Sequence, residues 1–450
     1  MVPNMAGLRR VRPDRVRSSS TSSASDGISQ RPPATWECPG KTRRYPSVNI
    51  LVLAGDVPAT SRMPGSPRLF SLCRELSRRH RLVLMARGES EERWRWFLAD
   101  PELTEVFAKI TRLPDPPPAT WRSQQHHRLR LACHFATLYR NPEYHRRLRD
   151  ALSEETRRAD FVYVDGLMMT QYLDERSAVP MAVDLHDCLS RLYAQGARSE
   201  RRWRAKLALS LESQQIARWE RSLAERFGVI VTNSTVDETA LRRLAPRGRI
   251  VTIPNGVDCE YFALGQNGHG SHRIVFTGVM NYGPNADAAQ YCANEIFPRV
   301  QAKIPDAEFW VVGADPSAEV WSLGERNGIH VTGRVDDVRP YIQSAGVCVC
   351  PMRYGAGIKN KILAAMAMGK PVVSTSVGLQ GIEARPGSDV LQADTPQKFA
   401  DELASVLTTD DLARRLSENG YRLVRERYSW TAMAESFDRA ISAVSTAQRS

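Results

Sequence analysis

The chain has 450 residues, which is long enough for two or three domains with full hydrophobic cores. Its 42% hydrophobic and 25% charged residues are an ordinary globular composition, and no apolar run approaches the ~18–20 residues that span a bilayer. The net charge of +12 comes without any nucleic-acid motif, so we expect no nucleic-acid partner.

The cysteines and the N-terminus indicate the cellular compartment. The eight cysteines are scattered singly, apart from Cys348 and Cys350, which alternation places on one face of a strand. Buried thiols are favoured over a metal site there, since no His/Cys cluster has zinc spacing. The N-terminus lacks the apolar region of a secretory signal. A reducing, cytoplasmic location is therefore expected, with peripheral contact at the inner face of the membrane as a possibility.

The first segment, residues 1–46, is basic and rich in Ser and Pro. It holds nine Lys or Arg residues against three Asp or Glu, and it shows no hydrophobic periodicity. Such a composition predicts a disordered tail. A transit peptide is a second interpretation, since those are also Arg- and Ser-rich and poor in acids.

Strand and helix patterns alternate through residues 47–258. A buried strand is predicted at 49–55 (NILVLAG), followed by a loop rich in Pro and Gly and then a helix, RLFSLCRELSRRH. Further strands are predicted at 81–86, 160–166, 180–187, 228–234 and 248–258, with a weak one at FAKITRL and a long charged helix over 199–226. This order predicts a parallel sheet built from βαβ units.

The alternation restarts after a Gly- and Asn-rich linker at 259–272. Strands are predicted at RIVFTG, AEFWVVG, IHVTG, AGVCVCP and SDVLQA, with helices between them, so that 273–428 forms a second domain. The final segment, 429–446, predicts a helix with apolar residues on one face. We therefore predict an α/β protein with two Rossmann-like, doubly wound domains facing each other across a cleft, where ligands bind at the carboxyl ends of the strands.

Two strand ends in the second domain have glycines where a ligand could approach. Gly278 ends a predicted strand in FTGVMNYGPN, before a helix whose first N–H groups are free. In VTGRVDDVRPY, Arg334 follows a strand, and either a phosphate or solvent could face it. The two aspartates after it are favoured as helix caps.

The segment GAGIKNKILAAMAMGKPVVS, at 355–374, has the pattern of an anion site. Gly355 and Gly357 allow the backbone to turn sharply, so that the N–H groups of the residues that follow point outward. A cluster of positive charge surrounds this point: Arg353, Lys359 and Lys361. Cations placed in this way stabilise a departing diphosphate. A βα unit that binds nothing is the other interpretation.

The first domain offers two further candidates. His186 and Asp187 follow a predicted strand in VDLHDCLS, where a structural role and a ligand-facing role are both open. Gly65 and Arg68 lie in the loop after the first strand, where a diphosphate or an acceptor could rest. The basic stretches RSQQHHRLRL, YHRRLRD and ARSERRWRAK fit either solvated helix faces or contact with an anionic membrane.

Together, IPNGVDCEYF, FTGVMNYGPNADA, VTGRVDDVRPY and GIKNKILAAMAMGKPVVST resemble the family 4 (group 1) glycosyltransferases. The resemblance covers residues 49–446 and is strongest to sugar transferases of bacterial exopolysaccharide and exosortase-associated clusters. It implies the GT-B fold and a retaining transfer from a nucleotide sugar without a metal or another cofactor. The acceptor, a glycan or a lipid-linked glycan, would bind the first domain and the donor the second, and the last helix would cross back to the first domain.

The chain departs from the family pattern on the 355–374 segment. The family usually carries two glutamates there, and the corresponding residues are Ala356 and Ala364. The second glutamate normally accepts hydrogen bonds from the nucleotide ribose, and each such charge-assisted bond is worth ~1.5–3 kcal/mol. Asn281, Asp336 or Glu383 could substitute. The Arg…Lys pair usual after the first strand of the donor domain is also absent.

The resemblance and the residue patterns together predict the site of an exopolysaccharide hexosyltransferase. The predicted catalytic residues are His186, Lys361 and Arg353. The predicted donor-binding residues are Gly278, Asn281, Arg334, Val335, Gly357, Ile358, Lys359, Asn360 and Ala364. The predicted acceptor-side residues are Gly65, Arg68 and Asp187. A non-catalytic GT-B protein that binds a sugar or a partner enzyme is the main alternative, and another reaction on the same fold is the third.

Overall fold

The structure is a computed structural model. It describes residues 35–37, 48–59, 67–88, 90–114, 142–173, 177–200, 202–265, 271–355 and 357–447. Within the segment predicted to be a disordered tail, it contains a short strand, β1 (Thr35–Glu37), which pairs antiparallel with β4 (Lys109–Arg112). The remainder of that segment lies outside the described residues.

The first sheet has eight strands in the order β1-β4-β3-β2-β5-β6-β7-β8, and all except β1 run parallel. Five of these strands are continuous apolar runs buried on both faces, as parallel sheets require: β2, β3, β5, β6 and β7. The bounds of the parallel strands other than β4 are β2 (Asn49–Ala54), β3 (Arg81–Ala86), β5 (Phe161–Asp165), β6 (Met181–Asp184), β7 (Val229–Thr232) and β8 (Ile250–Thr252). The weak strand predicted at FAKITRL is present as β4.

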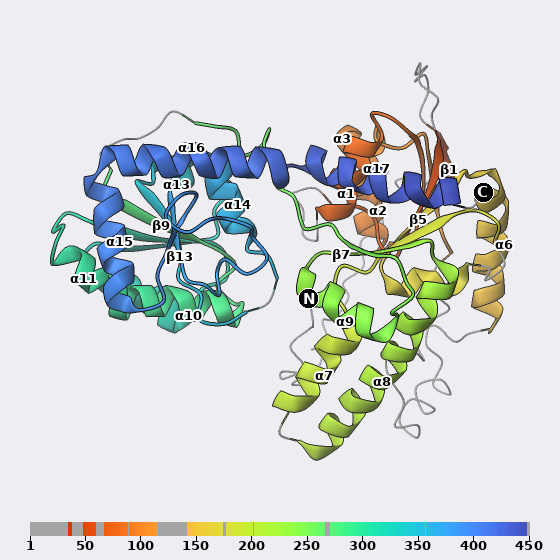
Figure 1. Cartoon of the computed structure of the whole chain (residues 1–450), viewed down its shortest axis with the longest axis horizontal. Helices are drawn as coiled ribbons and strands as arrows, with labels where there is room; N and C mark the ends of the chain where they lie inside the picture. The colour runs from red at the N-terminus through yellow and green to blue at the C-terminus, as the bar shows by residue number, and fades with distance from the viewer. Residues whose placement is uncertain are drawn as a thin grey trace, which may run out of the picture. The chain divides into compact units, whose positions relative to one another are not determined.

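Helices connect these strands (Figure 1). Two of them, α7 and α8, form a hairpin whose helices pack along each other. The bounds are α1 (Arg68–Leu76), α2 (Glu91–Ala99), α3 (Pro101–Thr104), α6 (Pro142–Arg158), the 3₁₀ helix η1 (Leu167–Tyr172), α7 (Leu189–Ser199), α8 (Trp203–Arg226) and α9 (Thr235–Leu244).

The second sheet has six parallel strands in the order β11-β10-β9-β12-β13-β14. These strands are β9 (Arg273–Thr277), β10 (Glu308–Val312), β11 (Ile329–Gly333), β12 (Val347–Cys350), β13 (Val372–Ser374) and β14 (Leu391–Gln392). The surrounding helices are α10 (Gly283–Tyr291), α11 (Phe297–Gln301), α12 (Ala318–Trp321), the 3₁₀ helix η3 (Ser322–Glu325), α13 (Arg339–Ser344), α14 (Asn360–Ala367), α15 (Pro396–Thr408) and α16 (Asp410–Arg427). Cys348 and Cys350 are free and buried within β12.

One helix differs from the sequence prediction. The run PNADAAQYCANEIFPRVQAKI was expected to be a single helix, but a π-helical turn, η2 (Cys292–Ile296), separates α10 from α11. Pro298 follows this turn at the second position of α11. Proline has no N–H to donate to the preceding turn, so the hydrogen-bonding pattern changes there.

Each sheet has one switch point at which the order of its strands reverses. In the first sheet this point lies between β2 and β5, and in the second it lies between β9 and β12. Connections leave to opposite sides at such a point, so a crevice opens at the carboxyl ends of the two strands. The candidate site is therefore sought beyond the ends of these four strands.

The last helix, α17 (Trp430–Ala447), belongs to the core of the first sheet although it follows the second sheet in sequence (Figure 1). Its apolar face packs with residues of α1, β2 and β5. Phe437 meets Tyr163 edge-on, with their ring centroids 4.8 Å apart. The buried residues of this face are Trp430, Met433, Phe437, Ile441 and Val444.

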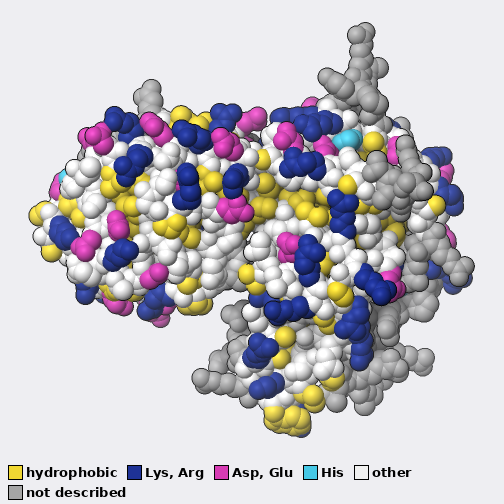
Figure 2. Space-filling view, in the orientation of Figure 1, with side chains coloured by type: hydrophobic (Ala, Val, Ile, Leu, Met, Phe, Trp, Pro, Cys, Tyr) yellow, Lys and Arg dark blue, Asp and Glu magenta, His cyan; other side chains and the backbone are white. Residues whose placement is uncertain are grey.

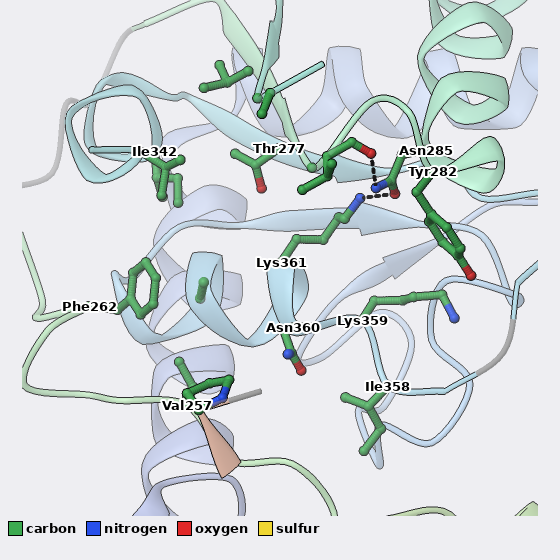
Figure 3. Close-up of a pocket in the computed structure, with 18 of the residues that line it drawn as sticks. Val257, Phe262, Thr277, Tyr282, Asn285, Ile342, Ile358, Lys359, Asn360 and Lys361 are labelled. Atoms are coloured by element: carbon green, nitrogen blue, oxygen red, sulfur yellow. Dashed lines mark hydrogen bonds between the residues drawn. The ribbon is translucent and has the colours of Figure 1, made fainter. Parts of the chain in front are cut away.

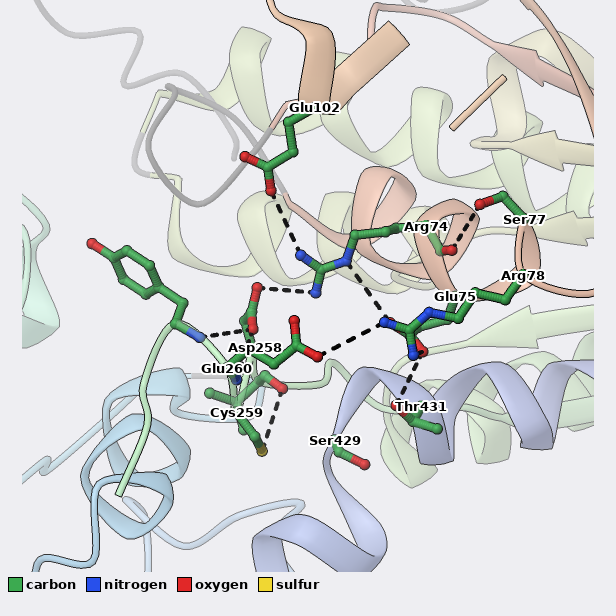
Figure 4. Close-up of polar contacts among 12 residues, drawn as sticks. Arg74, Glu75, Ser77, Arg78, Glu102, Asp258, Cys259, Glu260, Ser429 and Thr431 are labelled. Carbon is green, nitrogen blue, oxygen red and sulfur yellow. Dashed lines mark hydrogen bonds and ion pairs between the residues drawn. The ribbon is translucent and has the colours of Figure 1, made fainter. Parts of the chain in front are cut away.

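Helix α1 holds both segments that connect the two sheets through polar contacts (Figure 4). Nη2 of Arg74 donates to Oδ2 of Asp258, over 3.1 Å, in the segment that leads to β9. The Thr431 hydroxyl, at the start of α17, donates to Oε2 of Glu75 over 3.0 Å. Arg74 also lies 3.6 Å from the Glu102 carboxylate. The two connecting segments are thus fixed to one helix.

Candidate functional site

A cavity of about 650 Å³ opens at the switch point of the second sheet. Its walls come from the ends of β9 and β10, the loop after β12 and the start of α14, with further residues from the segment before β9. Thr277 and Gly278 line it at the end of β9, and Met352 lines it beyond β12. This is the position at which α/β sheets bind their ligands.

Lys361 is a cation on the wall of this cavity (Figure 3). Its Nζ donates to Oδ1 of Asn285 over 2.7 Å, and it lies 4.1 Å from the ring centroid of Phe276. The Asn285 amide in turn donates to the Val279 carbonyl over 2.9 Å. Burial lowers the pKa of Lys361 from 10.5 to about 8. Lys361 thus supplies a positive charge in a fixed position, and its pKa lies close to neutral pH.

The start of α14 adds further positive potential. Lys359 is 8% exposed, and its Nζ donates to the carbonyls of Gly357, over 2.6 Å, and Gly355, over 3.3 Å. Burial lowers the pKa of this lysine as well. Lys359 is the N-cap residue of the helix, which begins at Asn360, and its side chain makes no capping hydrogen bond. N–H groups at a helix start beside two lysines have the chemistry to bind an anion such as a phosphate group.

The backbone of this loop depends on glycine. Gly355 and Gly357 have φ angles of 126° and 75°, in the region that residues with a Cβ rarely adopt. Their turn brings Ile358, Lys359 and Asn360 to the cavity wall. The sequence prediction of a Gly–X–Gly turn before an exposed helix start describes this geometry. Ala356 lies outside the described residues.

Most of the predicted donor-binding residues line this single cavity. Those that do are Gly278, Arg334, Val335, Ile358, Lys359, Asn360 and Ala364, and the predicted catalytic residue Lys361 lines the cavity as well. Asn281 and Gly357 are not among its lining residues, and the Asn281 amide donates to the Asp315 carboxylate over 3.2 Å. Arg334 is largely exposed and lies 3.7 Å from Asp315.

The structure does not bring Arg353, a predicted catalytic residue, to the cavity wall. Its guanidinium pairs with the Asp287 carboxylate of α10 at 2.5 and 3.0 Å and lies over the ring of Tyr291. The sequence placed Arg353 near the diphosphate because it directly precedes the glycine turn. Its partner on α10 is 66 residues away in the chain, and sequence proximity could not reveal it.

Arg68 also differs from its predicted role on the acceptor side. The residue is only 1% exposed, and its Nε donates to Oδ2 of Asp184 over 2.8 Å. Its two terminal nitrogens donate to the carbonyls of Ile253 and Pro254 and to the Asn255 side chain. A buried arginine with these partners fastens α1 to the ends of β6 and β8 and presents no cation to a substrate. Gly65 lies outside the described residues.

His186 lies at the carboxyl end of β6, beside the switch point of the first sheet. It has a φ of 61°, and its Nε2 is 2.8 Å from Oδ1 of Asp165, at the end of β5. Burial lowers the pKa of His186, but the carboxylates of Asp165 and Asp184 outweigh this effect and raise the pKa to about 8. Asp187, the next residue, donates its backbone N–H to the Leu185 carbonyl.

Ala364 presents a methyl group to the cavity one turn after Asn360. It lines the cavity and is 7% exposed. Asp258 is the one carboxylate among the described lining residues. Its Oδ1 accepts from the N–H groups of Glu260 and Tyr261, and its Oδ2 accepts from Arg74. Among the described lining residues, the one carboxylate that could accept from a bound hydroxyl is therefore already hydrogen-bonded.

Asn285 is the main residue that sequence reasoning missed. It is buried at the first turn of α10 and positions Lys361, which lies 76 residues further along the chain. The only available signal was its place at the end of the FTGVMNYGPN segment, where polar residues at a helix start are common. Its contact with α14 depends on the β9–β12 pairing.

The described residues contain neither a group of side chains suited to a metal ion nor a helix suited to cross a membrane. No three His, Cys, Asp or Glu side chains in the described ranges are grouped so that they could hold a metal ion. None of the helices described is both long enough and apolar enough to cross a membrane.

Two family models match the chain, one in each half. The model "Glycosyltransferase Family 4" matches residues 67–261, and "Glycosyl transferases group 1" matches residues 271–409. The chain belongs to the family 4 (group 1) glycosyltransferases. The family assignment made from the sequence motifs is therefore confirmed.

Solved structures give this glycosyltransferase the predicted GT-B fold. It superposes on sucrose-phosphate synthase from Thermosynechococcus elongatus with a TM-score of 0.61 and 16% identity, covering 89% of this chain and 100% of the other. It superposes on HepE from Anabaena, solved in complex with UDP and glucose, with a TM-score of 0.57 and 14% identity, covering 88% and 100%. Identities this low establish the fold alone.

A further relative, known from its sequence, matches only part of the chain. The glycosyltransferase is 24% identical over 163 residues to an uncharacterized 44.6 kDa protein in the cps region of Klebsiella pneumoniae. The match covers 34% of this chain and 42% of that protein's length. The aligned part is thus less than half of the relative.

Proposed function

We propose that this glycosyltransferase moves a hexosyl group from a nucleoside-diphosphate sugar to a glycan or lipid-linked acceptor, with retention of the anomeric configuration, in extracellular polysaccharide biosynthesis. The observation that carries the proposal is the convergence of Lys359, Lys361 and the uncapped start of α14 on one cavity. These groups suit a diphosphate, which needs fixed positive charge and N–H donors.

In the proposed reaction, the bond between the sugar C1 and the diphosphate oxygen breaks. The acceptor hydroxyl oxygen bonds to C1 on the same face, and a phosphate oxygen of the donor takes its proton. Lys361, held by Asn285, and Lys359 stabilise the charge that develops on the diphosphate. This role requires no metal ion, and we propose that none is used. His186 would contact the donor sugar.

Two comparisons support the choice of substrate. The Anabaena relative binds UDP and glucose, so a UDP-sugar is the first donor to test. The Klebsiella relative lies in a cps region, which agrees with a role in extracellular polysaccharide. We propose that the enzyme acts in the cytoplasm at the inner face of the membrane, where a lipid-linked acceptor would be available.

Ala364 favours a second candidate, a non-catalytic GT-B protein that binds a sugar or a partner enzyme. The family's ribose-binding glutamate is replaced by a methyl group, and the loss of two charge-assisted hydrogen bonds costs ~3–6 kcal/mol of donor affinity if nothing substitutes. Nucleotide binding without transfer to any acceptor would favour this candidate.

The deciding experiment titrates UDP, GDP and ADP against the wild type and Ala364→Glu, by calorimetry and thermal shift, and then assays sugar transfer. The wild type is expected to bind one nucleotide at micromolar levels and to transfer its sugar. If only Ala364→Glu binds, the donor site has been lost and the proposed transferase activity is wrong. If the wild type binds a nucleotide but transfers nothing, the non-catalytic candidate is favoured.

A further inference from the structure

The tip of the α7–α8 hairpin exposes two large apolar side chains. Trp203, the first residue of α8, is 68% exposed, and Leu207 is 42% exposed. They are four residues apart on one helix, so they share one face. Neither belongs to the described hydrophobic clusters, whereas Ile216 and Leu223, further along α8, pack in the core of the first sheet.

Basic side chains surround these two residues. Arg198 near the end of α7, and Arg202, Arg204 and Lys206 at the start of α8, are all exposed. The nearby carboxylate, Glu200, pairs with Arg202 over 3.3 Å and leaves the charge of the group positive. Figure 2 shows hydrophobic side chains gathered at this end of the molecule, with Lys and Arg side chains next to them. We define the hairpin tip as Arg198, Arg202, Trp203, Arg204, Lys206 and Leu207.

A single exposed tryptophan is unremarkable, but this combination has a specific chemistry. A protein surface that binds at the membrane interface places Trp and Leu at the boundary between headgroups and acyl chains, and Lys and Arg against the lipid phosphates. The long basic side chains can extend from the apolar residues to the headgroup level. Here the Arg204 guanidinium lies 5.2 Å from the Trp203 ring, so cation and indole share one surface.

We propose that the hairpin tip binds an anionic phospholipid surface, with Trp203 and Leu207 entering the headgroup region and the basic side chains contacting lipid phosphates. A second copy of the chain is a poorer occupant because the protein carries a net charge of +12 and the tip is itself basic. Charge complementarity therefore favours the anionic lipid. The inference rests on the proposed action at the inner face of the membrane, for which it assigns a surface, but it does not depend on the donor cavity.

The test is co-sedimentation of the full chain with vesicles of phosphatidylcholine, with and without phosphatidylglycerol. The wild type is expected to bind the anionic vesicles and to lose binding as salt shortens the range of the attraction. Arg198→Gln/Arg204→Gln/Lys206→Gln is expected to weaken binding on the order of 100-fold, since each basic residue near the surface contributes about fivefold. Trp203→Ser/Leu207→Ser should also weaken it.

Trp321→Ser provides a matched control, since Trp321 is 48% exposed on α12 of the second sheet and should not affect vesicle binding. Every variant should keep the thermal transition and nucleotide response of the wild type. The proposal is overturned if the tip variants bind like the wild type, which would assign the attraction to another basic segment. It is also overturned if neutral vesicles bind equally, or if light scattering shows a dimer that only the tip variants lose.

Discussion

Lys361 has unusual acid–base properties because it is buried next to an amide and an aromatic ring. Asn285 and Phe276 stabilise its charged form, yet burial still lowers its pKa to about 8. A diphosphate binds the charged form. Its affinity for the free protein should therefore decrease as the pH rises through about 8, because the lysine then becomes neutral before the ligand arrives.

We predict that Lys361→Met lowers UDP affinity by at least tenfold at pH 7, the effect of losing one buried charge-assisted contact of ~1.5–3 kcal/mol. Lys361→Arg is the matched control, since arginine stays charged and should retain binding from pH 7 to pH 9. Calorimetric titration at several pH values measures both effects. Equal affinity in Lys361→Met and the wild type would remove this residue from the site.

His186 couples stability to pH in a definite direction. Its pKa is raised from 6.5 in the unfolded chain to about 8 in the fold, because the neighbouring Asp165 and Asp184 outweigh burial. The corresponding stabilisation is fully present below pH 6.5 and is lost as the pH rises through 8. It amounts to about 2 kcal/mol, from 1.36 kcal/mol for each pKa unit.

The free energy of unfolding from urea titrations at pH 6 and pH 9 tests this coupling. His186→Asn is the appropriate variant, because asparagine tolerates the positive φ of this position. Between pH 6 and pH 9 the wild type should lose about 2 kcal/mol more stability than this variant does. An unchanged pH dependence in the variant would mean that other groups cause it.

The loop between β9 and α10 carries a steric requirement that the sequence alone only suggested. A Cβ on Gly278 would lie 2.7 Å from the Asn285 amide nitrogen and 3.0 Å from Nζ of Lys361. Glycine therefore leaves the space in which these two side chains hydrogen-bond. The loop therefore helps to position Lys361 because residue 278 has no Cβ.

We predict that Gly278→Ala displaces the Asn285 side chain and weakens nucleotide binding by about tenfold, the cost of one disturbed buried polar contact of ~1–2 kcal/mol. The thermal transition should change little. Gly283→Ala on the adjacent first turn is the control, since its added Cβ would meet only the end of the Tyr354 side chain, at 3.3 Å. If the two variants bind UDP equally, Gly278 does not shape the site.

At the level of helices, strands and loops, the sequence predicted the features that depend on neighbouring residues. The alternation of buried runs predicted the strands of both sheets, and the glycine turn with its following helix predicted the cavity wall at α14. The acceptor-side role predicted for Arg68 did not take account of Asp184, its partner 116 residues away, and Arg353 was placed without knowledge of Asp287. Such pairings depend on the order of strands in the sheets. That order cannot be predicted from the hydrophobic periodicity of the sequence.

For the whole molecule, the attachment of α17 to the first sheet should dominate stability. Phe437 is fully buried against Tyr163, so Phe437→Ala is expected to lower the free energy of unfolding by ~3–5 kcal/mol, the usual cost of an aromatic cavity. Glu435→Ala, which removes one exposed ion pair with Arg79, should cost less than ~1 kcal/mol. Chemical denaturation distinguishes the two, and similar losses would show that α17 contributes little to the core.

The same attachment has a consequence for biosynthesis on the ribosome. Domains usually fold in the order in which they emerge, the N-terminal one first. Here the residues that complete the first core, Trp430 to Val444, are translated after the second sheet and its helices, which end at Arg427. The core of the first sheet is therefore completed only after the second sheet has been synthesised, and its apolar surface stays uncovered until α17 emerges.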